Sequence, residues 1–212
     1  MPRLADLDAV TFDVNGTLVG LVDPVPKLEQ LLKQWGVKRP LDTIRRAFET
    51  EGTVYAARAL EAHEPAAFAT LQRECTGVFL AEVGADALDP DEFAPSYVGA
   101  MQFEVLPDVR ESLRRLRRCG LTLAIVANFD LTLHERLESL GLAQEFALVV
   151  TPADAGAAKP DPAIFRVALE RLGVPAERAL HVGDGAADES GARAAGMQFR
   201  WAPVGSVLET WR

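Results

Sequence analysis

The sequence predicts an α/β fold: a parallel sheet flanked by helices and interrupted by an inserted all-helical segment. In the second half of the chain, short apolar runs alternate with amphipathic helical patterns. This alternation is typical of βα units and of a parallel sheet. One more apolar run stands near the start of the chain, separated from the others by the purely helical patterns of residues 20–103. The sheet is therefore expected to be built from two separate pieces of the chain.

The first strand is predicted at "AVTFD", where an apolar run ends in an acid, Asp13, and continues into a loop. In the helical segment that follows, apolar residues recur three and four positions apart, the spacing of amphipathic helices. Pro24 and Pro26 mark the start of its first helix and Gly36 marks the end. The remaining helical patterns of this segment are "LDTIRRAFETEG", "VYAARALEAH", "PAAFATLQRECTGVFLAEVG" and "PDEFAPSYVGAM".

The α/β pattern resumes near residue 104 with the helix "LPDVRESLRRLRRCG", whose basic last turn before Gly120 is a typical C-terminal signal. The later strands are predicted where apolar runs are long enough for burial on both faces. They are "LTLAIVA", "FALVVT", "ALHVG" and "MQFRWA", and the helices between them are "LTLHERLESLG", "PAIFRVALERLG" and "DESGARAAG". The sequence thus predicts a discontinuous core domain, residues 1–19 and 104–212, and a helical domain, residues 20–103.

Composition limits the function classes. The net charge of -9 is spread along the chain, which argues against nucleic acid or an anionic membrane as the main partner. Cys75 and Cys119 stand far apart and indicate no disulfide framework. The N-terminal stretch has no long apolar run of the kind found in signal peptides. A cytoplasmic protein that is a monomer or a homodimer is expected.

Polar residues stand at the ends of four predicted segments, and their placement carries the functional prediction. Asp13, Asn128 and Asp184 each follow a strand directly, and Lys159 follows shortly after the "FALVVT" strand. In an open parallel sheet, the loops at the carboxyl ends of the strands open on one crevice. We therefore expect an acid, an amide, a lysine and a second acid in one pocket.

The two acids of this pocket predict a magnesium site. Two facing carboxylates repel each other unless a cation joins them. Mg²⁺ prefers hard oxygen ligands and retains part of its water shell. Asp13 and Asp184 supply two such ligands. Asp188, at the start of the next helix, is either a third ligand or the residue that orients a metal-bound water.

The same pocket is suited to a phosphoryl group. Asp13 is a candidate nucleophile that forms an aspartyl phosphate. Lys159 neutralises the charge of the carboxylate and the phosphate. Asn128, Gly16 and Thr17 are candidate donors of hydrogen bonds to phosphoryl oxygens. His181, inside the predicted strand "ALHVG", is expected to be a packing residue.

The motifs "FDVNGTL", "IVANFD", "KPDPAIF" and "HVGDGAADESGARAAGM" together resemble the haloacid dehalogenase-like hydrolase superfamily, in the family's order and across the whole core. They are most similar to the branch called haloacid dehalogenase-like hydrolase domain-containing protein 3. The resemblance implies a Rossmann-like core, a mobile helical cap, Mg²⁺ and a phosphatase acting on a small-molecule phosphate ester. It also implies that the backbone carbonyl of Asn15 binds the metal and that Lys159 orients Asp13. The family's acid after Asp184 corresponds either to Asp188, four residues on, or to Glu189, five residues on, and Asp188 is preferred for its distance to Gly191.

Two residues depart from the family pattern. Family phosphatases usually have an aspartate where this chain has Asn15, and that aspartate protonates the leaving group. Loss of a general acid or base costs roughly 10²–10⁴-fold in rate. Ala127 stands where a serine or threonine hydroxyl usually donates to phosphate. A slow phosphatase is therefore expected.

Two alternatives remain. One is a non-catalytic protein that binds a phosphate ligand on this fold, which fits the loss of the acid at position 15 and of the hydroxyl at position 127. The other is a 2-haloacid dehalogenase, because a halide leaves without a proton and Asn15 is compatible with that reaction. The retained Asp184 argues against a dehalogenase, as does the absence of an aromatic residue at position 15.

Overall fold

The computed structural model describes residues 4–59, 62 and 64–209, and the chain divides into two compact units. The α/β unit comprises Met1–Gly20 and Glu104–Arg212, and the helical unit comprises Leu21–Phe103. Strands β2 (Val19–Leu21) and β3 (Phe103–Val105) pair in a two-stranded sheet. The chain therefore leaves and re-enters the α/β unit along neighbouring strands.

The α/β unit is built on a five-stranded sheet in the order β5-β4-β1-β6-β7. Its neighbouring strands pair in parallel throughout, which confirms the predicted α/β class. Parallel pairing leaves both faces of the sheet to be covered by helices, and the central strands are accordingly buried over almost their whole length. The strands are β1 (Ala9–Phe12), β4 (Thr122–Val126), β5 (Leu148–Val150), β6 (Ala179–Gly183) and β7 (Gln198–Trp201).

The three central strands end at the same level. Phe12 of β1 lies opposite Ile125 of β4 on one side and opposite Val182 of β6 on the other. Strand β1 is also where the order of the strands reverses direction along the sequence. The residues that follow these three strands are therefore delivered to the switch point of the sheet, where α/β proteins bind their ligands.

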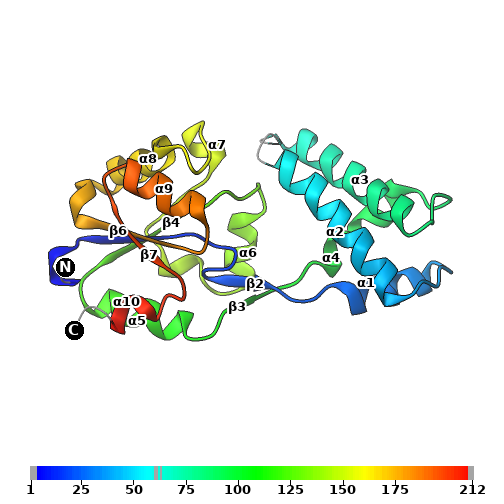
Figure 1. The fold of residues 1–212 in the computed structure, drawn as a ribbon, viewed down its shortest axis with the longest axis horizontal. Coiled ribbons are helices and arrows are strands. Elements are labelled where there is room, and N and C mark those ends of the chain that lie inside the picture. Colours follow the sequence, from blue (N-terminus) through cyan, green and yellow to red (C-terminus); the bar gives the residue numbers. More distant parts are fainter. Residues whose placement is uncertain (1–3, 60–61, 63, 210–212) are drawn as a thin grey trace. The chain divides into compact units, whose positions relative to one another are not determined.

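Helices cover the two faces of this sheet. Helices α8 and α9 lie on one face, and α5 with α10 lies on the other (Figure 1). The helices are α5 (Val109–Arg118), α6 (Leu133–Ser139), α7 (Pro152–Ala155), α8 (Pro162–Leu172), α9 (Ala186–Ala194) and α10 (Ser206–Glu209). Short 3-10 turns are η1 (Leu4–Asp6), η3 (Ala143–Glu145) and η4 (Ala176–Arg178).

Gly191 allows α9 to approach its neighbours closely. A Cβ atom at this position would lie 2.5 Å from the ring of Phe165 on α8 and 2.8 Å from the carbonyl oxygen of Pro160. Any larger residue would push α9 away from α8 and from the segment that carries Lys159. The glycine thus helps to set the depth at which that lysine is held.

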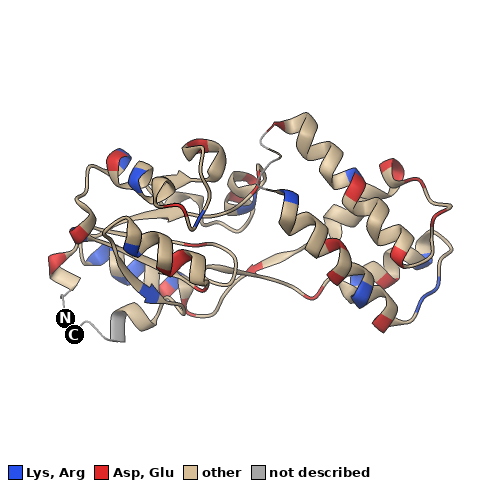
Figure 2. Ribbon diagram, turned by 45° about the horizontal axis from the view of Figure 1, so that its top comes forward, with Lys and Arg blue, Asp and Glu red and all other residues tan. Residues whose placement is uncertain are grey.

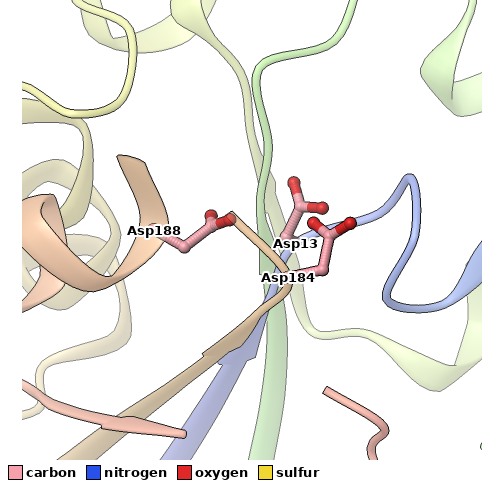
Figure 3. A group of neighbouring side chains, drawn as sticks. All are labelled: Asp13, Asp184 and Asp188. Carbon is pink, nitrogen blue, oxygen red and sulfur yellow. The ribbon is translucent and has the colours of Figure 1, made fainter. Parts of the chain in front are cut away.

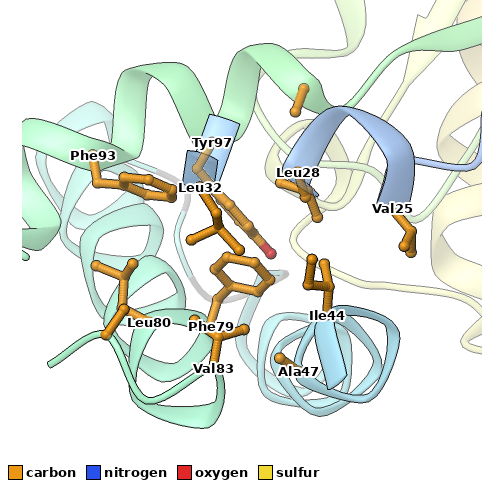
Figure 4. Close-up of a cluster of buried hydrophobic side chains, with 12 residues drawn as sticks. Val25, Leu28, Leu32, Ile44, Ala47, Phe79, Leu80, Val83, Phe93 and Tyr97 are labelled. Carbon is orange, nitrogen blue, oxygen red and sulfur yellow. The ribbon is translucent and has the colours of Figure 1, made fainter. Parts of the chain in front are cut away.

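The helical unit contains α1 (Val25–Gln34), α2 (Leu41–Arg58), α3 (Pro65–Glu82) and α4 (Pro90–Ala100). Their apolar faces meet in a core centred on aromatic rings (Figure 4). The rings of Phe79 and Tyr97 have centroids 4.8 Å apart, and Phe93 stacks on Phe79. Glu51 of α2 is buried beside this core and accepts a hydrogen bond from the Tyr97 hydroxyl at 3.0 Å.

The distribution of charged residues agrees with the charge pattern of the sequence. Both units carry acidic and basic residues, and the two signs are interspersed (Figure 2). In the part of the chain that the structure describes, no helix is both long enough and apolar enough to cross a membrane.

Candidate active site

Asp13 follows β1 directly, and its carboxylate is largely buried. The chain then turns sharply, with hydrogen bonds from Leu18 N to Val14 O and from Gly16 N to Val19 O, both 2.8 Å long. Gly16 lies at the tip of this turn with a φ of +81°, in the left-handed region where glycine is favoured. The turn brings the backbone of residues 15 and 16 close to Asp13.

Three carboxylates form the centre of the site: Asp13 after β1, Asp184 after β6 and Asp188 in the first turn of α9 (Figure 3). One oxygen from each lies within 4.8 Å of the others. Asp184 is exposed, whereas Asp13 and Asp188 are buried. A Cβ atom on Gly16 would lie 2.0 Å from Oδ2 of Asp184, so this carboxylate occupies space that only a glycine leaves open.

Lys159 neutralises the two buried carboxylates. Its Nζ atom lies 2.5 Å from Oδ1 of Asp13 and 2.6 Å from Oδ1 of Asp188, and its side chain is almost fully buried. Burial raises the pKa of Asp13, and the positive charge of Lys159 acts against this rise. The lysine therefore favours the ionised form of the carboxylate.

Asp188 is held from three directions. Besides Lys159, its Oδ1 atom contacts Nε2 of His181 at 3.1 Å, and its Oδ2 atom accepts a hydrogen bond from the backbone N–H of Gly185. Burial alone would raise the pKa of Asp188, but the hydrogen bonds and charges of His181 and Lys159 hold it at about 2. Asp188 is therefore an anion at neutral pH.

His181 links this carboxylate to the sheet. Its Nδ1 atom lies 2.8 Å from Oγ1 of Thr11, which is its direct neighbour on β1. Both side chains have no exposed surface, and burial lowers the pKa of the imidazole. A neutral imidazole that donates from Nε2 to Asp188 accepts at Nδ1 from the Thr11 hydroxyl, so both of its nitrogens are satisfied.

Asn128 holds the segment that carries the lysine. Its side-chain Oδ1 accepts from Lys159 N at 2.8 Å, and its Nδ2 donates to Lys159 O at 2.9 Å. The sequence predicted a role in binding a phosphoryl group. The structure gives the side chain a positioning role toward Lys159 and leaves only the second N–H of its amide for another acceptor.

The other predicted residues lie around the same carboxylate. Thr17 is buried, with its hydroxyl 3.5 Å from Oδ2 of Asp13. Asn15 is exposed, and its side chain has no hydrogen-bond partner among the residues that the structure describes. Glu189, the other acid considered for the metal site, pairs instead with Arg193 at 3.0 Å. The structure thus places Asp188, and not Glu189, beside Asp13.

Sequence reasoning missed His181 and Thr11, because each stands inside an apolar run that accounts for a strand. A signal was nevertheless present. Two polar residues interrupt "AVTFD" and "ALHVGD" shortly before the acid that ends each run. In neighbouring parallel strands, such residues meet at one level and need each other as hydrogen-bond partners.

The donor set fits a magnesium ion. Mg²⁺ prefers hard oxygen ligands and usually binds one or two carboxylates. Asp184 has no hydrogen-bond partner among the described residues, so both of its oxygens are available. Asp13 accepts from Lys159 at Oδ1, and its Oδ2 makes a long contact of 3.5 Å with the Thr17 hydroxyl. The backbone N–H of Val14 also donates to this carboxylate. Asp188 is engaged at both oxygens, which makes it the least available of the three.

Comparisons with known proteins identify one family of hydrolases. A family model described as haloacid dehalogenase-like hydrolase matches residues 7–196. Haloacid dehalogenase-like hydrolase domain-containing protein 3 of Danio rerio is 45% identical over 89 residues, which cover 42% of this chain and 37% of that protein. A phosphoglycolate phosphatase of Pseudomonas savastanoi is 32% identical over 197 residues, covering 89% of this chain and 66% of that protein.

A solved structure is similar over most of the chain. The HAD phosphatase from Thermococcus onnurineus matches with a TM-score of 0.58 and 28% identity, covering 92% of this chain and 86% of that one. For the first curated relatives, the matched segment spans less than half of their own length.

Proposed function

The chain belongs to the haloacid dehalogenase-like hydrolase family, and from this membership we propose that it is a Mg²⁺-dependent phosphatase of small phosphorylated metabolites. One observation carries the proposal. Asp13 is buried at the switch point of the sheet with Lys159 on one of its oxygens and a second, exposed acid, Asp184, beside it. A nucleophile, its counter-charge and a free metal ligand thus lie in one place.

In the proposed reaction, a carboxylate oxygen of Asp13 attacks phosphorus and forms an aspartyl phosphate. Lys159 donates a hydrogen bond to Oδ1, so Oδ2 is proposed as the attacking oxygen, and the second lone pair of Oδ1 is proposed for Mg²⁺. The hydroxyl of Thr17 and the second amide N–H of Asn128 are the donors proposed for the phosphoryl oxygens. The backbone N–H of Gly16 already donates to Val19 O within the turn. Water then attacks phosphorus and releases Asp13 as a carboxylate.

The ligands proposed for Mg²⁺ are Asp13, Asp184 and the backbone carbonyl of Asn15. Asp188 is less available as a ligand, because both of its oxygens already accept hydrogen bonds. A bound Mg²⁺ would neutralise negative charge on the phosphoryl group and orient it toward Asp13. This role also explains why a second acid lies so close to the nucleophile, since two carboxylates otherwise repel each other. A 2-haloacid dehalogenase needs no metal, so it would not need Asp184 as a metal ligand.

Asn15 and Ala127 set the proposed rate. An amide at position 15 cannot give a proton to the leaving group or take one from water, and this costs roughly 10²–10⁴-fold. Ala127 lacks a hydroxyl, and loss of one such donor costs about 10²–10³-fold. We therefore propose a slow enzyme, with the helical unit as the cap that determines which metabolite enters.

The test is phosphate release from a panel of phosphorylated metabolites, with Mg²⁺ and with EDTA. Wild type is compared with Asp13→Asn and Asp184→Asn, and Asn15→Asp is included to restore the acid. We expect turnover that needs Mg²⁺ and both aspartates. Absence of turnover in wild type and in Asn15→Asp would contradict the proposal and favour a binding protein on this fold.

A further inference from the structure

We propose that the site acts on acyl phosphates, phosphoryl donors whose leaving group departs as a stable carboxylate and needs no proton. This inference rests on the proposed function and concerns the substrate class of the same site. The inference depends on the groups around Asp13 that have a proton to give. In the described part of the α/β unit, none of these groups is placed for the leaving group.

The ionisable groups nearest Asp13 lie on the nucleophile's own side. In an in-line transfer, the leaving group departs from phosphorus opposite the attacking oxygen. The ammonium group of Lys159 donates hydrogen bonds to Oδ1 of Asp13 at 2.5 Å and to Oδ1 of Asp188 at 2.6 Å. It therefore belongs to the attacking side, where its protons hold two carboxylates in place.

The groups behind Lys159 have no proton to offer either. Asp188 accepts hydrogen bonds at both oxygens, which is the behaviour of a carboxylate rather than a carboxylic acid. His181 has no exposed surface, and both of its nitrogens are used by Thr11 and Asp188. Asp184, the remaining acid of the cluster, is the exposed group with the oxygens suited to a cation.

Position 15 is the exposed place beside the nucleophile, and it holds an amide. Asn15 can donate an N–H hydrogen bond to a departing oxygen but cannot transfer a proton to it. An alkyl phosphate would have to expel a strongly basic alkoxide, whereas an acyl phosphate expels a weakly basic carboxylate. A phosphoanhydride has a good leaving group too, but its extra phosphates would add negative charge next to three carboxylates, of which Lys159 pairs with only two.

The reaction balances without an acid. Asp13 forms a bond to phosphorus while the bond from phosphorus to the acyl oxygen breaks, and the electron pair leaves with the carboxylate. In the second step, water forms a bond to phosphorus, the bond to Asp13 breaks, and the proton of the water passes to the solvent. The aspartyl phosphate is itself an acyl phosphate, so Asp13 is also a good leaving group in this second step.

The experiment compares three donors in the presence of Mg²⁺: acetyl phosphate, p-nitrophenyl phosphate and glycerol phosphate. Wild type, Asn15→Asp and Asp13→Asn are assayed for phosphate release and, by mass spectrometry, for a phosphoryl group on Asp13. Gln30→Glu is the matched control, because it also turns an amide into an acid, on the exposed face of α1. Activity is counted as the part that Asp13→Asn abolishes.

We expect wild type and Gln30→Glu to prefer acetyl phosphate over glycerol phosphate by a ratio that falls roughly 10²-fold or more in Asn15→Asp, because the new acid assists only the alkoxide. If wild type cleaves glycerol phosphate as fast as acetyl phosphate, or Asn15→Asp accelerates both donors equally, the inference is overturned. If no donor phosphorylates Asp13 in wild type or in Asn15→Asp, the proposed phosphatase function itself fails.

Discussion

The imidazole Nε2 of His181 lies 3.1 Å from Oδ1 of Asp188, the same oxygen that receives the ammonium group of Lys159. One buried oxygen therefore accepts from two donors and cannot turn away from either. Through Lys159, the position of Asp188 affects that of Asp13, the proposed nucleophile. The contact connects the interior of the sheet to the carboxylate of Asp13.

His181 is thus expected to be a positioning residue. His181→Leu should lower kcat by about ten- to a hundredfold, the usual cost of removing a group that orients a reacting residue, with little change in KM. His181→Gln, which keeps an N–H donor, should recover part of kcat. Steady-state kinetics with thermal unfolding as the folding control checks this. A lower melting temperature with unchanged kcat would show that His181 only supports packing.

Lys159 is expected to matter for both stability and activity. Lys159→Met would leave Asp13 and Asp188 facing each other as buried carboxylates, which should cost about 3–5 kcal/mol of unfolding free energy. The exposed pair of Arg193 and Glu189 on α9 offers a matched control, and Arg193→Met should cost less than about 1 kcal/mol. Denaturant unfolding measures both, and equal losses would contradict the role given to Lys159.

Gly16 is expected to control the metal site through Asp184. Gly16→Ala would place a Cβ atom 2.0 Å from the present position of Oδ2 and displace this carboxylate. Magnesium binding, measured by calorimetry, should weaken by about tenfold or more, in the range seen when the surroundings of a metal ligand are disturbed.

Gly36 provides the control for this substitution. Its φ of +78° is nearly the same, but a Cβ atom there would meet nothing within 4 Å. Gly36→Ala should therefore carry the same backbone strain, about 1–2 kcal/mol, and leave magnesium binding unchanged. Equal affinities in the two variants would show that the position of Asp184 does not matter for the metal.

The sequence predicted the five strands of the main sheet because buried parallel strands are continuous apolar runs, which are visible in any sequence. Strands β2 and β3 were not predicted, since each has three residues and is defined by pairing with a segment far along the chain. The two separate helical patterns "LDTIRRAFETEG" and "VYAARALEAH" were wrong as a division, because one helix covers Gly52 and the start of the second pattern. Helix α2 runs through Gly52, because packing outweighs the cost of about 1 kcal/mol for a glycine.

In the site, too, some features were predictable from the sequence and others depend on contacts with distant segments. The residues at the strand ends were predictable because the level of each strand end follows from parallel topology. The partner of each side chain was not, since Asn128 bonds to the backbone of Lys159 and this depends on the path of a loop. His181 was taken for a packing residue because its partner, Thr11, lies 170 residues away in the sequence.

Glu51 is expected to make the stability of the helical unit depend on pH. It joins α2 to Tyr97 of α4 and to Cys75 of α3, and burial raises its pKa above the usual value near 4.5. The unfolded chain releases this proton at a lower pH than the folded chain does. The stability that the protonated carboxyl contributes is therefore fully present below the unfolded pKa and is lost as the pH rises through the folded one.

Glu51→Gln should remove this loss. Its amide oxygen can still accept from the Tyr97 hydroxyl and has no charge to bury, so the variant should be more stable than wild type at neutral pH and should lose part of the pH dependence. Glu49→Gln, at an exposed position of the same helix, should leave the dependence as it is. Thermal unfolding of the three proteins from acid to neutral pH measures this difference. Parallel curves for wild type and Glu51→Gln would mean that Glu51 is already ionised in the folded unit.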